Sequence, residues 1–293
     1  MSTPKTKILV PTDFSENANK ALEEAIFFAK HFNSEIVLLH VIENYLINAT
    51  LSKAIGFNKE RNESLKMVIE EQLSEMAEEL SKKENVTISW ETTFGKSYKE
   101  IVQKSEDLDV DFIIMGTHGA NGMEKFMVGT NASRVASIAK KPVITIQGKA
   151  DLSNFSNLVL PLDLTKETRG KVNKAVELAK SFNATIHVVA IQTTSDEFLT
   201  KKLNLQMNQV INHIVEKNIN VTSKVLEAEN VAQEIVNYAQ SFSNSALIIM
   251  TQQEMGLTDY ILGSEANRII KNAEIPVVSI RPKVTGKVVF RPY

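Results

Sequence analysis

Hydrophobic and polar residues follow two alternating periods along this chain. Short runs of aliphatic and β-branched residues are typical of buried strands, and they alternate with longer stretches in which apolar residues recur every three to four positions, as on amphipathic helices. We expect strands at 6–12, 35–42, 86–93, 111–116 and 142–147, with helices at 16–32, 59–84, 97–107 and 130–139, and then strands at 157–162, 184–191, 219–226, 246–250 and 276–281. The apolar stripe of the helix at 59–84 should face the core; it consists of Leu65, Val68, Ile69, Leu73, Met76 and Leu80. This alternation predicts an α/β fold built from βαβ units and parallel strands.

The second half of the chain repeats the first. Residues 8–13 match residues 158–163 at an offset of 150, and Gly129 matches Gly263 at an offset of 134, so the first half carries about 16 additional residues. We place these near Asn44 to Asn58, as a lid or a surface insertion. A period this long indicates duplication of a whole domain rather than a solenoid repeat.

The repeat predicts the domain boundaries. We expect one domain at 1–148, a second at 155–282 and a C-terminal tail at 283–293, with a polar linker from Gly148 to Asn154. The two copies should pack against each other through their final strands, near Val143 and Val277. Whether two such chains associate further stays open.

Composition narrows the class of protein. The 293 residues are 43% hydrophobic and 23% charged, with a formal net charge of −2, which favours a globular protein and argues against a duplex nucleic-acid binder. The chain has no cysteine, which excludes disulfides and thiolate metal sites. No apolar run approaches the roughly 20 residues of a membrane helix, and residues 1–11 lack the core of a signal peptide. We therefore expect a cytoplasmic protein without membrane contact.

A glycine pattern after the fourth strand predicts an anion site. The run Gly116-Thr117-His118-Gly119 follows a buried strand, and Gly129-Thr130 begins the next helix. Gly116 and Gly119 can take positive φ and can let backbone N–H groups approach a ligand with no Cβ in the way, beside the donor-rich N-terminus of the helix. His118 either donates to a phosphate or is an ordinary exposed loop residue.

Asp13 ends the first strand, where it should meet this glycine loop at the switch point of the sheet. A carboxylate there can accept hydrogen bonds from ribose hydroxyls. The alternative is a structural role, with Ser15 capping the following helix and Asp13 completing the turn. Both roles can coexist.

These segments together resemble the universal stress protein family of adenine-nucleotide-binding α/β proteins. The resemblance rests on the opening Val10-Pro11-Thr12-Asp13-Phe14-Ser15, the closing Pro142-Val143-Ile144 and the Gly-x2-Gly-x9-Gly-Thr motif of residues 116–130. It implies two tandem Rossmann-like domains, each a five-stranded parallel sheet of order 3-2-1-4-5 flanked by helices. It also implies an adenine nucleotide as ligand: ATP, with AMP or ADP as alternatives and Mg²⁺ as a candidate companion.

The resemblance assigns roles to residues of the first copy. Adenosine would lie beside Pro11, Thr12 and Asp13, and the backbone of Val41 would meet the adenine. The phosphates would lie against Gly116, Gly119, Gly129, Thr130 and Asn131. Met115 and His118 complete the candidate set.

The second copy departs from the motif. We align Thr251 and Glu254 with Gly116 and Gly119, in a loop one residue shorter, and only Gly263-Ser264 remains of the pattern. A glutamate facing phosphates is repulsive, by up to about 4 kcal/mol per charge pair at 4 Å and a dielectric near 20. We therefore predict that the second copy does not bind triphosphate; Asp163 leaves room for adenosine or another polar ligand.

The other motifs in the sequence do not indicate a functional site. Gly95-Lys96-Ser97 lacks the earlier glycine of a P-loop, so Gly95 is expected to be a turn residue and Ser97 a helix cap. His40 is expected to be a structural histidine at the end of the second strand. Neither the histidine spacing nor any Gly-x-Ser-x-Gly elbow indicates a metal site or a nucleophile.

Three functions are consistent with the sequence. The first is a nucleotide-dependent regulatory module of the stress response that acts on an unknown protein partner. The second is a slow ATP hydrolase, for which Asp13 is the candidate water-activating group. The third is an adaptor that works without nucleotide.

Overall fold

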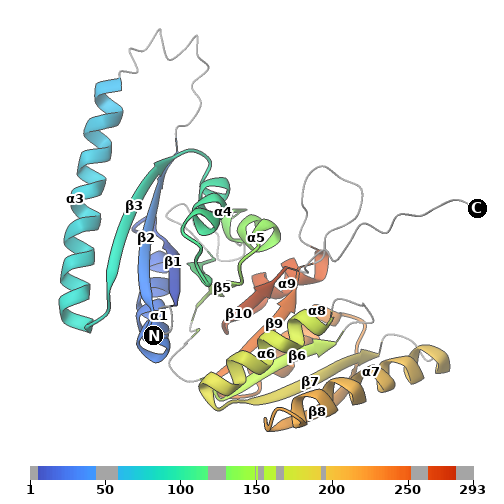
Figure 1. Ribbon diagram of the computed structural model, residues 1–293. Helices are drawn as coiled ribbons and strands as arrows, with labels where there is room; N and C mark the ends of the chain where they lie inside the picture. Colours follow the sequence, from blue (N-terminus) through green and yellow to red (C-terminus); the bar gives the residue numbers. More distant parts are fainter. Residues whose placement is uncertain are drawn as a thin grey trace, which may run out of the picture.

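The computed structural model describes residues 6–43, 59–117, 130–148, 150, 155–162, 168–192, 196–251 and 263–281. Strands and helices alternate through both halves of the chain (Figure 1). The first half contains β1 (Lys7–Pro11), α1 (Glu16–Phe32), β2 (Glu35–Ile42), α3 (Lys59–Glu84), β3 (Ile88–Phe94), α4 (Ser97–Asp107), β4 (Phe112–Gly116), α5 (Thr130–Ile138) and β5 (Val143–Ile146). The second contains β6 (Asn157–Leu162), α6 (Thr168–Phe182), β7 (Thr185–Gln192), α7 (Glu197–Val215), β8 (Val221–Glu227), α8 (Val231–Gln240), β9 (Ser245–Met250), α9 (Ser264–Asn272) and β10 (Val277–Ile280). These bounds agree with the expected ranges to within about two residues.

The described strands form one ten-stranded sheet in the order β3-β2-β1-β4-β5-β10-β9-β6-β7-β8. Within each half the strands are parallel and follow the predicted order 3-2-1-4-5. The halves join where β10 pairs antiparallel with β5, so that Val277 lies opposite Thr145 and Ser279 opposite Val143. The prediction that the final strands connect the two copies is therefore confirmed.

Helices cover both faces of this sheet, and each face has a core shared by the two halves. One core lies under α1, α3, α6 and α7, and the other lies under α4, α5, α8 and α9. Neighbouring residues of a strand contribute to opposite cores: Ile8 belongs to the first and Leu9 to the second. Burial on both faces explains why these strands are continuously apolar.

The N-terminal turns of α3 differ from the expectation. Ile69 and Leu73 are buried as predicted, but Leu65 is 48% exposed and Val68 is 60% exposed. A helix of 26 residues is about 39 Å long, whereas a strand of seven residues such as β3 spans only about 23 Å. The start of α3 therefore extends past the sheet (Figure 1), and part of the predicted stripe has nothing to cover.

The additional residues of the first half also lie partly in this helix. Its counterpart α7 has 19 residues, compared with 26 in α3. The predicted insertion at 44–58 therefore accounts for only part of the extra length, and it lies outside the described residues.

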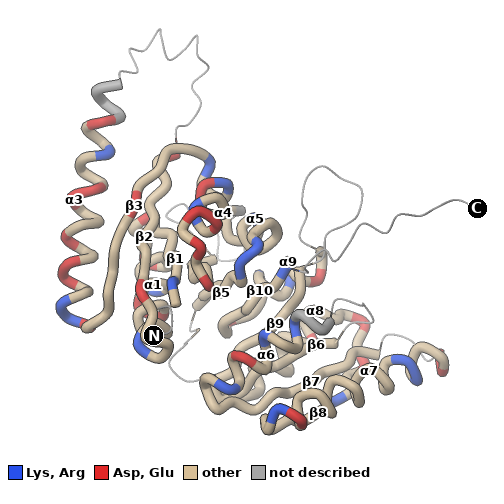
Figure 2. Tube along the Cα trace, viewed as in Figure 1, with Lys and Arg blue, Asp and Glu red and all other residues tan. Residues whose placement is uncertain are grey.

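Charged side chains of both signs are interspersed over the helices (Figure 2). Several form exposed or half-exposed ion pairs, such as Lys104 with Glu91 at 2.6 Å and Lys140 with Glu106 at 2.5 Å. Pairs of this kind contribute about 0–1 kcal/mol each. The fold therefore depends on its two apolar cores rather than on surface charge.

Candidate functional site

The switch point of the first half lies between β1 and β4, where the strand order reverses. The β1–β4 pairing ends with Leu9 opposite Ile113, whereas β1 continues along β2 to Pro11, opposite Leu39. The residues that follow these positions therefore lie at one end of the sheet, between strands that diverge. Ligands of open parallel sheets bind at such a point.

The turn after β1 is held by its own side chains. Thr12 Oγ1 accepts a hydrogen bond from the Phe14 N–H at 3.0 Å, and Asp13 Oδ1 accepts one from the Ser15 N–H at 3.1 Å. Ser15 then caps α1 by accepting from the Ala18 N–H at 3.2 Å. The structural role considered for Asp13 and Ser15 is therefore confirmed. The Asp13 side chain is exposed at this end of the sheet.

His40 anchors this turn from the neighbouring strand. Its Nδ1 lies 2.9 Å from the Thr12 carbonyl oxygen, which can only accept, so Nδ1 carries the proton. The imidazole also stacks on Phe14, with ring centroids 5.0 Å apart. Phe14 has φ of 61°, a conformation that costs about 1–3 kcal/mol in a bulky residue and persists only when its surroundings hold it.

Burial lowers the pKa of His40, although the hydrogen bond to Thr12 and the charge of Asp13 oppose the shift. The neutral ring is therefore favoured, with Nε2 as an acceptor. The expectation of a structural histidine is confirmed. The contact with Phe14 was not anticipated, although Phe14 follows β1 and His40 lies near the end of β2, its neighbour in the sheet.

Gly116 ends β4 in contact with the start of α1. A Cβ on Gly116 would lie 2.8 Å from the Asn17 carbonyl oxygen, a distance that real Cβ atoms essentially never show. Its φ is not positive, so Gly116 does not use the left-handed conformation that a glycine allows. Glycine is needed because the backbone of α1 approaches the end of β4.

The structure brings together the candidate residues that it describes. Pro11, buried Thr12, half-buried Val41 and buried Met115 all lie at the carboxyl ends of adjacent strands. The backbone of Thr130 begins α5, and Asn131 follows it in the first turn. The remaining candidates lie outside the described residues; they are His118, Gly119 and Gly129.

The second half shows which of its residues corresponds to Gly116. The Thr117 N–H donates to the Ile146 carbonyl at 3.1 Å, and the Thr251 N–H donates to the Ile280 carbonyl at 3.0 Å. Thr251 is thus the counterpart of Thr117, both residues being buried, and Met250 stands where the first half has Gly116.

Our alignment of Thr251 with Gly116 was therefore wrong by one residue. With the corrected alignment, the loops of the two halves have equal length, and the number equivalent to Gly119 falls on Gln253 rather than Glu254. The repulsion assigned to Glu254 loses its basis, and both residues lie outside the described part of the chain.

The loop before α4 is not a phosphate site. Gly95 has φ of 153°, in agreement with its expected turn role, but the N-cap of α4 is Lys96 and not Ser97. The Ser97 N–H is satisfied instead by Glu43 Oε1, at 2.9 Å. A carboxylate at this helix N-terminus takes the place that a phosphate would need.

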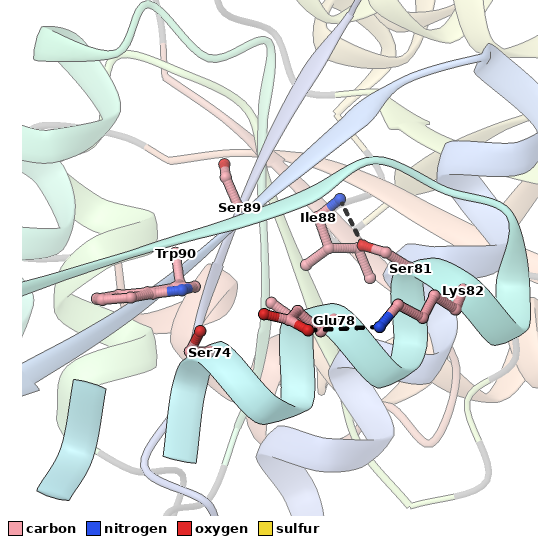
Figure 3. A pocket seen from close by; sticks show the side chains of 8 residues that line it. Ser74, Glu78, Ser81, Lys82, Ile88, Ser89 and Trp90 are labelled. Carbon is pink, nitrogen blue, oxygen red and sulfur yellow. Dashed lines mark hydrogen bonds and ion pairs between the residues drawn. The ribbon is translucent and has the colours of Figure 1, made fainter. Parts of the chain in front are cut away.

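A shallow hollow of about 400 Å³ lies elsewhere, between α3 and the edge strand β3 (Figure 3). Ser81 accepts from the Ile88 N–H at 3.1 Å, Glu78 pairs with Lys82 at 3.4 Å, and Trp90 forms one wall. Two pairs of its polar groups thus engage each other, and no candidate residue lines the hollow.

Among the residues that the structure describes, no group of three or more histidines and carboxylates could hold a metal ion. None of the helices described is long and apolar enough to cross a membrane.

Comparisons with known proteins agree with this architecture. The family model described as "Universal stress protein family" matches residues 5–147 and again residues 154–281. Universal stress protein MJ0577 of Methanocaldococcus jannaschii is 34% identical over 161 residues, which cover 51% of this chain and 99% of that protein. Universal stress protein YxiE of Bacillus subtilis is 26% identical over 151 residues, 48% of this chain and 98% of that protein.

A solved structure shares the two-copy arrangement. The crystal structure of a universal stress protein from Archaeoglobus fulgidus superposes with a TM-score of 0.74 and 22% identity, covering 96% of this chain and 100% of that one. At this identity the likeness shows the fold. Because the family model matches nearly the whole chain in two successive copies, the chain belongs to the universal stress protein family.

Proposed function

We propose that the first half binds an adenine nucleotide, ATP or its di- or monophosphate, at the carboxyl ends of β1 and β4. In this proposal the protein is a nucleotide-dependent regulatory module of the stress response. The family membership and the Gly-x2-Gly-x9-Gly-Thr spacing of residues 116–130 support the choice of ligand. Location in the cytoplasm stays a prediction from the sequence.

One observation carries the proposal: the candidate residues come from distant parts of the sequence and meet at one switch point. The turn at Thr12 and Asp13 faces the adenosine side, where Val41 lies near the end of β2. Gly116 begins the phosphate side, and the N-terminus of α5, like that of any helix, presents backbone N–H donors and a positive dipole. An exposed carboxylate at Asp13 suits ribose hydroxyls, while it also keeps its hydrogen bond to Ser15.

The second half supports the assignment by contrast. At positions equivalent to Thr12, His40 and Gly116 it has Leu162, Ala190 and Met250, all of them buried. Polar and small residues are thus present in the half with the intact motif and are replaced by apolar or larger ones in the other. This pattern favours one nucleotide per chain.

The identity of the ligand can be tested by calorimetric titration of nucleotide-free protein with ATP, ADP, AMP and GTP, each with and without Mg²⁺. We expect binding of the adenine nucleotides and at least about tenfold weaker binding of GTP, because a site built around one base leaves polar groups unpaired with the other. Absence of binding at about 1 mM of every nucleotide would refute the proposal, since affinities weaker than that are too low for a cellular sensor.

A further inference from the structure

A lysine lies buried at the switch point of the second half. Lys171, in the first turns of α6, is only 2% exposed, although lysines are almost never fully buried without a partner. Its Nζ donates to the Pro161 carbonyl oxygen at 2.5 Å. In the first half the equivalent position is Ala21, which is fully buried and apolar.

The hydrogen bond to Pro161 shows where the Lys171 ammonium group lies in the sheet. The β6–β9 pairing ends with Val159 opposite Leu247, whereas β6 continues along β7 with Pro161 opposite Val189. Pro161 therefore lies beyond the last contact with β9, as Pro11 does in the first half. Lys171 Nζ is thus held at the end of β6 where it diverges from β9, which is the place where a ligand of such a sheet binds.

Met250 occupies the other side of the same switch point. It ends β9 and is 8% exposed, whereas its counterpart Gly116 leaves no room for even a Cβ beside α1. Met250 thus carries a long side chain at the position where the first half has no side chain at all. Small residues at both positions of the first half are therefore replaced by long side chains in the second.

We propose that Lys171 and Met250 close the switch point of the second half from within, so that the Lys171 ammonium occupies the place of a ligand. The inference rests on the proposed nucleotide site of the first half, because it assigns the residues that remove this site from the second. The second half is then a permanently filled partner that completes the sheet and both cores, and nucleotide is sensed by the first half alone.

Amine labelling tests the closure without any nucleotide. The full-length protein is treated briefly with an acylating reagent, and labelled lysines are identified by peptide mass spectrometry. Lys171 should react at least about a hundredfold more slowly than exposed Lys99 and Lys202, because the reagent reaches it only after local opening. Labelling of Lys171 at the rate of the exposed lysines would overturn the proposal, whether or not the protein binds nucleotide.

A pair of matched double variants tests which residues close the site. Lys171→Ala with Met250→Gly restores the residues of the first half, and the adenosine stoichiometry should rise from one to two per chain. Lys171→Met with Met250→Leu keeps the space filled and should leave the stoichiometry at one. A folded Ala/Gly variant that still binds one adenosine would show that other residues close the site and would overturn the assignment. If the wild-type protein binds no adenine nucleotide, the proposed function fails, and the labelling result decides the closure.

Discussion

Ile144 in β5 and Val278 in β10 are register partners across the junction of the two halves, and they occupy equivalent positions in the duplicated chain. Equivalent residues of the two halves also contact each other on each face of the sheet. His31 Nε2 lies 2.6 Å from the carbonyl oxygen of its counterpart Ser181, and Ser133 Oγ lies 3.1 Å from Oδ1 of its counterpart Asn267. Contacts between equivalent residues mark a pseudo-two-fold axis. This axis runs through the sheet at the β5–β10 pair, so one chain has the symmetry of a dimer.

The aromatic side chains at this axis should couple the stability of the halves. The ring of Phe182 in α6 stacks on His31 at 4.3 Å and lies 5.3 Å from Phe32, both in α1. Phe182→Ala should lower the free energy of unfolding by about 3 kcal/mol, a typical cost for removing a packed aromatic ring. Urea titration followed by circular dichroism should show one shifted transition, because the cores are continuous across both halves.

Phe198→Ala is the matched control, since this side chain is 74% exposed and its removal should change stability by less than about 0.5 kcal/mol. Two separate transitions, of which only one moves in the Phe182 variant, would show that the halves unfold independently.

The anchor between His40 and the β1 turn should set the affinity of the nucleotide site. His40→Leu removes the donor to Thr12, and the strained turn at Phe14 should relax. Nucleotide affinity should fall about tenfold, or roughly 1.4 kcal/mol. His40→Asn retains a donor near Nδ1 and should recover most of the affinity. Equal loss in both variants would indicate that the ring itself, and not its hydrogen bond, holds the turn.

The stability of the protein should fall as pH drops below about 7. Burial lowers the pKa values of both His40 and His187 below the usual value of about 6.5. The unfolded chain therefore binds more protons than the folded one in this range, so unfolding becomes easier as pH falls toward the lowered pKa values. The urea midpoint should be lower at about pH 5.5 than at about pH 7.5.

The combined variant His40→Asn and His187→Asn should flatten this dependence. In the wild type, His187 Nε2 lies 2.8 Å from Asn157 Oδ1 and its Nδ1 lies 2.7 Å from Thr222 Oγ1, so both ring nitrogens are already engaged in the neutral form. A midpoint that rises on acidification would contradict the assigned direction of both shifts.

Because α3 extends past the sheet, truncating two leucines of its apolar stripe should lower the stability of the protein by different amounts. Leu73→Ala should destabilise the fold by about 3 kcal/mol, because Leu73 is fully buried. Leu65→Ala should cost less than about 1 kcal/mol, because Leu65 is 48% exposed. The chain has one tryptophan, Trp90, in the strand against α3, so its fluorescence reports unfolding of this region. Equal costs would contradict the exposed placement of Leu65.

The hydrophobic pattern was sufficient to predict the helices and strands. Strands buried on both faces are continuously apolar, and they stand out from the amphipathic helices between them. The bounds of α1, α3 and α4 agree with prediction, and so does the strand order of each half. The exposure of Leu65 could not be predicted, since an apolar pattern does not reveal where the underlying sheet ends. Ser97 was an expected cap, but Glu43, which is distant in sequence, satisfies the N–H instead.

The candidate site was predicted in outline, and the sequence left two physical reasons open for its glycine. A glycine pattern cannot distinguish positive φ from close approach, and only the contact with Asn17 shows that Gly116 needs the latter. The alignment of the second half failed by one residue because Met250 resembles nothing in the glycine motif. The paired threonines, Thr117 and Thr251, were the signal that would have corrected it.

The central claim is that one nucleotide binds at the switch point of the first half, and Gly116→Met tests it by introducing the residue of the second half. ATP with Mg²⁺ is titrated calorimetrically into the wild-type protein, the Gly116→Met variant and a Met250→Leu control, after circular dichroism has shown that all three are folded. We predict one site per chain in the wild type and the control, and at least about tenfold weaker binding in Gly116→Met. Two sites per chain, or unchanged affinity in the folded Gly116→Met variant, would contradict the account.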